Sequence, residues 1–395
     1  MRIAIITSGT LPVPPVEGGA VEHLIDFYLS ENEKQGKNDI SVYSVLPKND
    51  FTLPDYVHTH FLFVKISGFF PRFRRFLYSK IHPGEYYHPY VEYFLSRIKE
   101  DLRKHNFDLV VLENRPAFAL NLRHSIKSKI LLHLHTDTIF PGAPKAEEIL
   151  DSIDGVIAVS DYIHQRVLSV KKMPVETVFN GIDLKHYSDS KAVSRELLGL
   201  NEDDFVFVYF GRVIPEKGVT EIIDSMINLA PSYPYLKLLI VGSSFYGDDK
   251  KLDPYLVSIK ERACAIENRL SFTGYVPNEQ IPCILKACNA AVLPSKCNEA
   301  FGLTLLEAMA CGLPLVSTYA GGIPEVADGV SLLVECDENM AVNLTRAMKS
   351  LLDDGQLRMS LSQKGLERCQ KFSKETYSSC MLRKLNELAD SCSQA

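Results

Sequence analysis

Short apolar runs rich in β-branched residues recur through the first half of the chain, separated by segments long enough for helices. These runs are Ile3–Ile6, Ile40–Val45, Leu109–Leu112, Ile130–Leu134 and Val156–Val159. Strands joined by such long crossovers pair in parallel, so the pattern predicts a mostly parallel α/β sheet. We expect this first Rossmann-like domain to cover residues 1–185.

A second series of apolar runs predicts a second sheet of the same kind. It consists of Phe205–Phe210, Leu236–Val241, Leu270–Phe272, Ala290–Leu293 and Leu313–Ser317. The polar, turn-rich stretch from about Asp183 to Asp204 fits a link between the sheets, and a helical pattern runs from about Phe372 to Asp390. The second domain is therefore expected at residues 186–371, followed by a terminal helix within 372–395.

Composition limits the functions that this chain can serve. A length of 395 residues fits two domains, and 46% hydrophobic with 23% charged residues is ordinary for a globular protein. The net charge of -6 argues against a protein that wraps nucleic acid. No run approaches the roughly 20 apolar residues of a membrane span. The nine cysteines form no Cys-x-x-Cys pair, which indicates reduced thiols and a cytoplasmic protein.

The most informative stretch runs from Glu299 to Glu307 and reads Glu-Ala-Phe-Gly-Leu-Thr-Leu-Leu-Glu. Apolar runs on both sides predict a strand, a loop, a helix and a strand of a parallel sheet. The helix would begin near Phe301, Gly302 and Leu303, where unpaired N–H groups and the positive dipole end suit a phosphate. The two carboxylates suit sugar hydroxyls, although a surface helix with two solvated glutamates has the same spacing.

The run from Pro294 to Glu325 resembles the donor-site block of family 4 retaining glycosyltransferases, which are two-domain GT-B enzymes. Further matches follow in the family's order: Gly18-Gly19, Val159-Ser160, Asn180-Gly181-Ile182-Asp183, Gly211-Arg212, Lys217-Gly218, Val241-Gly242 and Phe272-Thr273-Gly274. Together they extend over most of the chain. The resemblance implies two Rossmann-like domains that face each other across a cleft, with the C-terminal helix crossing back to the first domain.

Two cations follow the predicted strand at Phe205–Phe210. Arg212 offers a forked set of donors and Lys217 a compact charge, and together they can neutralise a leaving diphosphate. A solvated basic loop is the alternative for such residues taken alone. Aligned with the acidic pair, they favour a diphosphate site, to which Gly211 adds a backbone contact.

The resemblance also implies roles for the two acids. Glu307 would accept hydrogen bonds from a ribose diol, while Glu299 would hold hydroxyls of the transferred sugar and favour the positive charge that develops at its anomeric carbon. Glu299 is not assigned as a covalent nucleophile. The resemblance points instead to a mechanism in which the leaving phosphate helps to deprotonate the acceptor on the same face, which retains the anomeric configuration.

His133, His135 and Asp137 share one face at the end of a predicted strand, because side chains alternate along a strand. Two histidines and a carboxylate could bind a metal. The chain has no Asp-x-Asp triplet to hold Mg²⁺ or Mn²⁺ against a diphosphate. The resemblance instead places His135 near the donor sugar, where it can hydrogen-bond a hydroxyl, and leaves His133 in the core. We therefore expect no metal.

Gly18-Gly19 follows a proline-rich loop and precedes a helical pattern. It is not a Gly-x-Gly-x-x-Gly fingerprint, which argues against a nicotinamide cofactor. These small residues let the backbone approach the donor phosphate or the acceptor, a plain turn being the alternative. Other backbone contacts are expected at Gly242, at Gly321-Gly322 beside the sugar and, by resemblance, near Tyr275 for the nucleobase.

Residues 61–80 contain no acid and interleave basic with aromatic side chains. Such a segment could lie on an anionic membrane surface and admit a lipid-linked acceptor. A helix packed by its aromatics, with its arginines in solvent, fits the same residues. A peripheral contact with the inner face of the membrane is thus one of two open interpretations.

These features together predict a cytoplasmic, metal-independent, retaining hexosyltransferase. It would use a nucleotide sugar, UDP-linked, to extend a glycan or lipid-linked acceptor in cell-surface polysaccharide biosynthesis, with no cofactor because the nucleotide sugar is a substrate. The alternatives are a sugar-nucleotide epimerase or soluble glycoside synthase of the same fold, and a non-catalytic GT-B-like binding subunit. The sugar, the base, the acceptor, the linkage and the oligomeric state cannot be read from these residues.

Overall fold

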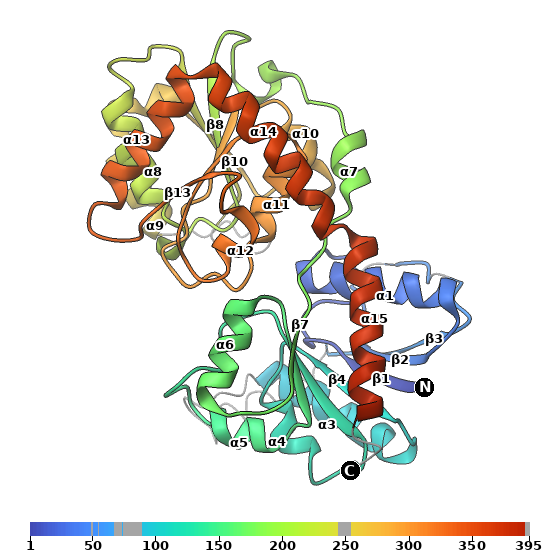
Figure 1. The fold of residues 1–395 in the computed structure, drawn as a ribbon. Helices are drawn as coiled ribbons and strands as arrows, with labels where there is room; N and C mark the ends of the chain where they lie inside the picture. The colour runs from blue at the N-terminus through green and yellow to red at the C-terminus, as the bar shows by residue number, and fades with distance from the viewer. Residues whose placement is uncertain (49, 54, 67–72, 74–88, 244–253, 392–395) are drawn as a thin grey trace. The chain divides into compact units, whose positions relative to one another are not determined.

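The structure is a computed structural model of the chain, and it describes all residues except 49, 54, 67–72, 74–88, 244–253 and 392–395. The chain divides into two compact units, one formed by Met1–Gly181 together with Lys374–Ala395 and the other by Ile182–Ser373 (Figure 1). The sequence predicts domain ends after residues 185 and 371, and in the structure the chain passes from one unit to the other after Gly181 and after Ser373.

The first unit is built on a seven-stranded parallel sheet with the strand order β3-β2-β1-β4-β5-β6-β7. The strands are β1 (Arg2–Ile6), β2 (Asp39–Val45), β3 (Thr59–Val64), β4 (Leu109–Glu113), β5 (Lys129–Leu134), β6 (Gly155–Ala158) and β7 (Val175–Thr177). All residues of β4 and β6 are buried. This explains the uninterrupted apolar runs, because a central parallel strand is covered on both faces.

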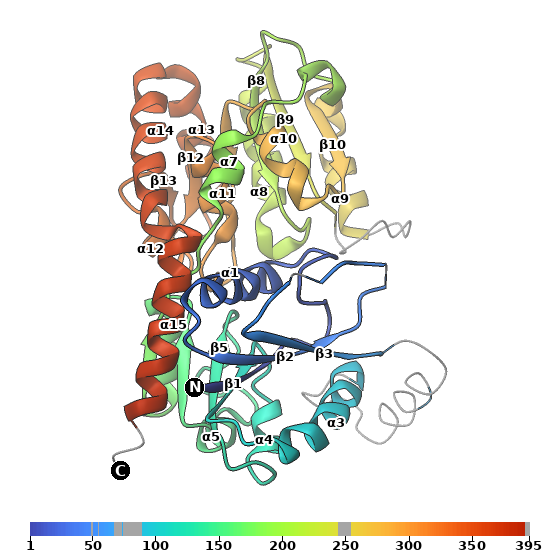
Figure 2. The ribbon, with the colours of Figure 1, turned by 90° about the vertical axis from the view of Figure 1, so that its right-hand side faces the viewer.

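Helices cover both faces of this sheet. They are α1 (Ala20–Gln35), α3 (Pro89–Lys104), α4 (Phe118–Leu122), α5 (Ala146–Asp151), α6 (Asp161–Val170) and α15 (Lys374–Ser391). Helix α1 lies on one face and α3 on the other (Figure 2). Helix α15, from the end of the chain, lies side by side with α1, and the rings of Tyr28 and Tyr377 are 6.4 Å apart.

The second unit contains a six-stranded parallel sheet with the order β10-β9-β8-β11-β12-β13. Its strands are β8 (Phe205–Phe210), β9 (Leu236–Val241), β10 (Leu270–Gly274), β11 (Ala290–Val292), β12 (Leu315–Thr318) and β13 (Leu332–Val334). Its helices are α7 (Leu184–Asp189), α8 (Val219–Leu229), α9 (Pro254–Arg262), α10 (Ile281–Leu285), α11 (Leu303–Ala310), α12 (Ile323–Ala327), α13 (Met340–Asp353) and α14 (Gly355–Cys369). Helix α8 packs against α13, and α11 against α14.

Every apolar run that the sequence analysis singled out is a strand, but three strands were missed. Most of β3 falls within the basic, aromatic segment 61–80, which was interpreted as a membrane-binding segment or a helix. Strands β7 and β13 are only three residues long, so they leave a weak pattern in the sequence. Phe61 and Phe63 lie on β3, where their rings stack 6.0 Å apart, so a helix over this start of the segment is wrong. Most of the remaining segment lies outside the described residues.

The stretch from Asp183 to Asp204 is more ordered than the expected link. It contains α7 and a 3-10 helix at Arg195–Leu198, and the side chain of Asp183 accepts the N–H of His186 at the start of α7. Tyr187 on α7 is only 3% exposed. An aromatic side chain that packs into the core therefore holds this polar segment in place.

Within the described part of the chain, no helix has both the length and the apolar character that crossing a bilayer requires.

Candidate active site

In the second unit, the strand order reverses between β8 and β11. Ligands of open α/β sheets bind beyond the carboxyl ends of the strands at such a switch point. Arg212 and Lys217 follow β8, while Ser295 and Glu299 follow β11. The structure thus brings two of the predicted segments, far apart in sequence, to the same edge of the sheet.

Lys217 and Glu299 form an ion pair at this edge. The hydroxyl of Ser295 donates to the same carboxylate oxygen, Oε2, over 3.2 Å, and the Nζ atom of Lys217 lies 3.4 Å from that hydroxyl. The side chains of Lys217 and Glu299 are 23% and 24% exposed, so solvent and small ligands can still reach them. The site therefore presents a cation and an anion whose positions are fixed before any ligand binds.

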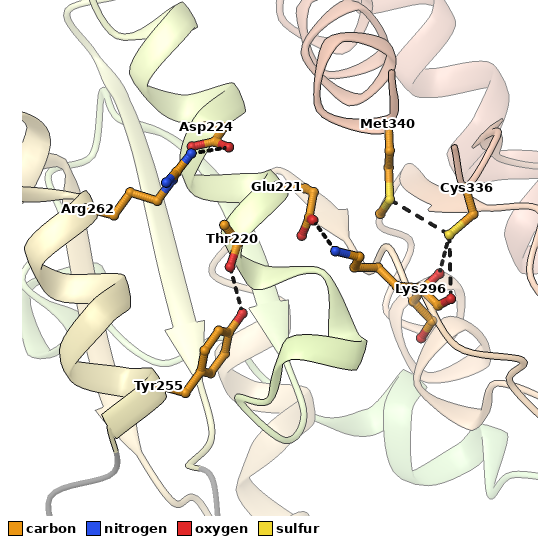
Figure 3. A network of polar contacts seen from close by, with 9 residues as sticks. Thr220, Glu221, Asp224, Tyr255, Arg262, Lys296, Cys336 and Met340 are labelled. Carbon is orange, nitrogen blue, oxygen red and sulfur yellow. Dashed lines mark hydrogen bonds and ion pairs between the residues drawn. The ribbon is translucent and has the colours of Figure 1, made fainter. Parts of the chain in front are cut away.

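The loop that carries Glu299 is tied to α8 and to the segment before it. The backbone N–H of Lys296 donates to the carbonyl of Glu216 over 2.8 Å. The Lys296 side chain pairs with Glu221 on α8, and the thiol of Cys336 reaches the Lys296 carbonyl from the other side (Figure 3). These contacts fix the backbone of residues 295–299 beyond the carboxyl ends of β8 and β11.

A glycine pair supports Glu299 from the other side. Gly321 has a φ of 59°, and a Cβ atom there would lie 2.2 Å from the carbonyl oxygen of Glu299 and 2.7 Å from its nitrogen. The N–H of Gly322 donates to the same carbonyl over 2.8 Å. The N–H of Gly322 therefore holds the backbone of Glu299, and the expected approach of the Gly321-Gly322 backbone to the sugar remains a prediction.

Helix α11 begins at Leu303, as the sequence predicts, and Gly302 precedes it with a left-handed φ of 99°. Phe301 is 2% exposed, and its ring packs 5.7 Å from that of Phe372. Phe301 is thus part of the core. Its contribution to a ligand site is confined to its backbone and to the way it fixes the start of α11.

Glu307 lies one turn inside α11 and is partly buried. The hydroxyl of Tyr187, on α7, donates a hydrogen bond to it. Burial raises the pKa of Glu307 to about 7, an effect that the hydrogen bond from Tyr187 partly offsets. Tyr187 was not anticipated as a partner; its only signal in the sequence is an aromatic residue within a polar stretch.

Three glycines end the neighbouring strands β8, β9 and β10. Gly211 and Gly242 both have a φ of 133°, and a Cβ atom on Gly242 would lie 2.0 Å from the carbonyl oxygen of Gly211. The N–H of Gly242 donates to the carbonyl of Gly274 over 2.9 Å. Tyr275, next along the chain, is 48% exposed. The glycines therefore let the backbones at the ends of β8 and β9 approach more closely than a side chain on Gly242 would allow.

Arg212 follows Gly211, and its side chain is exposed. Its carbonyl accepts a hydrogen bond from the hydroxyl of Tyr209, which fixes the backbone of this turn. The exposed guanidinium of Arg212 therefore extends from a turn whose backbone is held in place.

Glu113 joins the two predicted histidines in the first unit. Residue pairing between β4 and β5 sets Glu113 opposite His133. Oε2 of Glu113 lies 2.9 Å from Nδ1 of His133 and 3.0 Å from Nε2 of His135, and Oε1 accepts the hydroxyl of Tyr28 over 3.0 Å. Glu113 was missed in the sequence, although an acid that ends the apolar run Leu109–Leu112 was a usable signal.

Burial alone would raise the pKa of Glu113, but the charge and hydrogen bonds of His133 and His135 outweigh it and hold the pKa well below its usual range. Burial, with the nearby His133, lowers the pKa of His135 to about 4. At neutral pH the cluster therefore contains a carboxylate and a neutral His135.

Asp137 does not share this cluster, contrary to the expectation from strand alternation. It lies beyond the end of β5, accepts the hydroxyl of Tyr162 over 2.7 Å and pairs with Arg166 over 3.1 Å. The donor atoms of Glu113, His133 and His135 all lie within 4.8 Å of one another, so these three, rather than the predicted trio, form the set that could hold a metal ion. That the protein works without a metal remains a prediction.

Gly18 and Gly19 precede α1 in the first unit. Glu22, in the first turn of that helix, accepts the hydroxyl of Ser8, and burial raises its pKa to about 6. Of the predicted site residues, Gly18, Gly19 and His135 belong to the first unit, and the others to the second.

Comparison with known proteins adds the family context. The family model described as glycosyl transferases group 1 matches residues 190–368, and that of Glycosyltransferase Family 4 matches residues 39–186. The chain is also 28% identical over 378 residues to YtcC of Bacillus subtilis (strain 168), described as a glycosyltransferase, covering 90% of this chain and 84% of that protein.

Solved structures resemble the whole chain. Sucrose-phosphate synthase from Thermosynechococcus elongatus has a TM-score of 0.76 at 21% identity, covering 98% of this chain and 99% of that one. The Anabaena protein Alr3699/HepE, solved in complex with UDP-glucose, has a TM-score of 0.71 at 18% identity, covering 98% of this chain and 100% of that one. The fold is therefore a two-domain α/β fold of the GT-B type.

Proposed function

Since the chain belongs to glycosyltransferase family 4, we propose that it is a retaining hexosyltransferase that uses a nucleotide sugar and needs no metal. The donor in this proposal is UDP-linked, in keeping with the UDP-glucose bound by the Anabaena protein of the same fold. The acceptor is a glycan or a lipid-linked glycan of the cell surface. The eight free cysteines among the described residues fit a reducing, cytoplasmic location.

The observation that carries the proposal is the group formed by Lys217, Ser295 and Glu299 at the switch point of the second sheet. When a sugar leaves its diphosphate, negative charge grows on the phosphate and positive charge on the anomeric carbon. A compact cation can stabilise the negative charge on the phosphate, and a carboxylate held beside it can stabilise the positive charge on the anomeric carbon. Arg212, displayed on the neighbouring turn, adds a forked donor for the phosphate oxygens.

Retention of configuration follows in this proposal from the leaving phosphate acting as the base for the acceptor. The described residues around Glu299 support that assignment because its carboxylate is already engaged by Lys217 and Ser295. A carboxylate held in this way is better suited to stabilising charge than to attacking the sugar.

A donor screen followed by product analysis tests the proposal. Nucleotide diphosphates and nucleotide sugars are first ranked by the increase in melting temperature, because a ligand that binds only the folded chain stabilises it. The best donor is then offered to the protein, and the anomeric configuration of the product is read by proton NMR. Retention with chelator present supports the proposal, whereas inversion or a strict metal requirement contradicts it. Isomerised nucleotide sugar would reveal an epimerase, and binding without turnover a non-catalytic subunit.

The variant Lys217→Ala should reduce kcat by about 100-fold or more, since removing one preorganised donor from a charged transition state costs this much. The matched control is Lys349→Ala, which removes an exposed lysine that pairs with Asp353 in the same unit. The control should keep the activity of the unaltered protein. An Lys217→Ala protein that turns over normally would remove the basis for the assignment.

A further inference from the structure

A buried polar network ends the central strands of the first unit. Glu113 and His133 are completely buried, and the His135 side chain is 4% exposed. The strand order of this sheet reverses between β1 and β4, so the carboxyl end of β4, where Glu113 stands, borders the switch point. A buried carboxylate at this edge of an open α/β sheet is placed where ligands bind.

The carboxylate of Glu113 determines which nitrogen of His135 carries the proton. A carboxylate only accepts hydrogen bonds, and Oε2 lies 3.0 Å from Nε2 of His135. Nε2 must therefore be protonated, and in a neutral imidazole Nδ1 is then an acceptor.

The backbone of His135 is held as firmly as its ring. Asn114, directly after Glu113, has a left-handed φ of 55°, which is uncommon for a residue other than glycine. Its side-chain oxygen accepts the N–H of His135 over 3.1 Å and the hydroxyl of Thr136 over 2.9 Å. Strained backbone of this kind persists where the surrounding contacts require it, and it is frequent at functional sites.

Two ring nitrogens of this network are left over: Nε2 of His133, on a completely buried side chain, and Nδ1 of His135, on a side chain that is 4% exposed at the edge of the sheet. Nδ1 of His135 is buried and has no hydrogen-bond partner among the described residues. A buried acceptor without a donor is costly, so a group that donates a hydrogen bond is needed there. A hydroxyl meets this need, whereas a phosphate oxygen or a carboxylate would add a second acceptor.

We propose that Glu113 is a positioning residue that holds His135 in the Nε2–H tautomer, so that Nδ1 accepts a hydrogen bond from a sugar hydroxyl of the substrate. The choice of a sugar as the ligand rests on the proposed function, but the tautomer does not. His135 then acts as a neutral acceptor rather than as an acid, and it favours ligands with a hydroxyl at this position.

The tautomer is measured directly by long-range proton–nitrogen NMR on protein labelled with ¹⁵N-histidine. The His135 signals are identified by their loss in His135→Asn. At pH 7 the unaltered protein should show His135 protonated at Nε2 only. In Glu113→Gln this preference should be lost. The matched control is Asp101→Asn, the same carboxylate-to-amide change at a residue that accepts the hydroxyl of Tyr43 over 2.6 Å, and it should leave the spectrum of His135 unchanged.

Kinetic measurements with the donor found in the screen test whether the acceptor at the position of His135 Nδ1, rather than the group at Nε2, supports activity. In His135→Asn the amide oxygen can stand near the position of Nδ1, whereas the longer side chain of His135→Gln reaches toward Glu113 and leaves no acceptor there. His135→Asn should therefore retain at least about 10-fold more kcat/KM than His135→Gln, because misplacing a positioned group can cost up to about 100-fold. Glu113→Gln should lower kcat/KM by about 10-fold or more.

Three results would overturn the proposal: a proton on Nδ1 of His135 in the unaltered protein, greater activity in His135→Gln than in His135→Asn, or a stoichiometric metal ion bound to a ring nitrogen of His135. Should Glu113→Gln fail to fold, the tautomer of the unaltered protein still decides the matter. A protein without any transfer activity but with the expected tautomer would instead refute the proposed function.

Discussion

At the scale of single residues, the second unit is arranged around the backbone of Glu299. Its carbonyl accepts the N–H of Gly322, its side chain pairs with Lys217, and Gly321 packs against it more closely than any other residue type could. In the proposed function the Glu299 carboxylate faces one sugar carbon, which requires placement to within about 0.5 Å. These contacts provide that placement.

We predict that Gly321→Ala reduces turnover by about 10-fold or more, because its Cβ would lie 2.2 Å from the Glu299 carbonyl and must displace it. The control is Gly329→Ala: Gly329 also has a positive φ, 74°, but a Cβ atom added there would meet nothing within 4 Å. Both variants should lose about 1–2 kcal/mol of stability because alanine is strained in a left-handed conformation, and Gly321→Ala should lose more because its Cβ atom also meets backbone atoms. Steady-state kinetics and urea unfolding separate the effects, and equal activities in the two variants would contradict this role of Gly321.

At the scale of elements, α7 and α11 meet through Tyr187 and Glu307. The contact joins the polar stretch after the first unit to the helix that starts beside Glu299. Glu307 is the residue that we expect to bind a ribose diol, and burial raises its pKa to about 7. Donors that hydrogen-bond the ionised form would lower its pKa again.

We predict that Glu307→Gln changes the pH dependence of stability. The folded chain holds the Glu307 proton up to about pH 7, whereas the unfolded chain releases it near the ordinary value of 4.5. The unaltered protein therefore loses stability as pH rises through that window, and Gln, which cannot ionise, should not lose it. Relative to the unaltered protein, Glu307→Gln should gain between about 1 and 3 kcal/mol from pH 4.5 to pH 8.

Urea unfolding at pH 5 and pH 8 measures this difference. The exposed Glu338 offers the control Glu338→Gln, which should follow the unaltered protein at both pH values. A pH-independent difference for Glu307→Gln would show that the carboxyl group is already ionised at low pH.

At the scale of the whole molecule, the chain forms two units with separate cores, and α15 belongs to the first of them although it follows the second in sequence. Tyr377 on α15 packs near Tyr28, whose hydroxyl donates to Glu113. The last helix therefore supports the polar network of the first unit as well as its hydrophobic core.

We predict that Leu385→Ala, on α15, destabilises the first unit by about 2–5 kcal/mol, because Leu385 is 0% exposed and its removal leaves a cavity. Leu344→Ala, at an equally buried position on α13, should affect the second unit instead. Hydrogen exchange localises each effect to the amides of one unit. Protection lost equally in both units for either variant would contradict separate cores.

The sequence by itself determined the layout of the elements. Runs of apolar residues marked the central strands, and the spacing between them implied helical crossovers, because burial on both faces of a parallel sheet leaves a local signal. The motif around Glu299 and the cations after β8 were recognisable for a similar reason, since each is a short stretch with its own chemistry.

Only the tertiary structure decided which side chains meet. Strand alternation suggested Asp137 as the partner of the histidines, but the pairing of β4 with β5 supplied Glu113, and Tyr187 reached Glu307 from a segment expected to be a link. Neither contact has a local signal, because it depends on which strands are neighbours and on how a helix packs. Contacts between residues far apart in the chain arise from the packing of complete elements, and a pattern along the sequence does not contain that information.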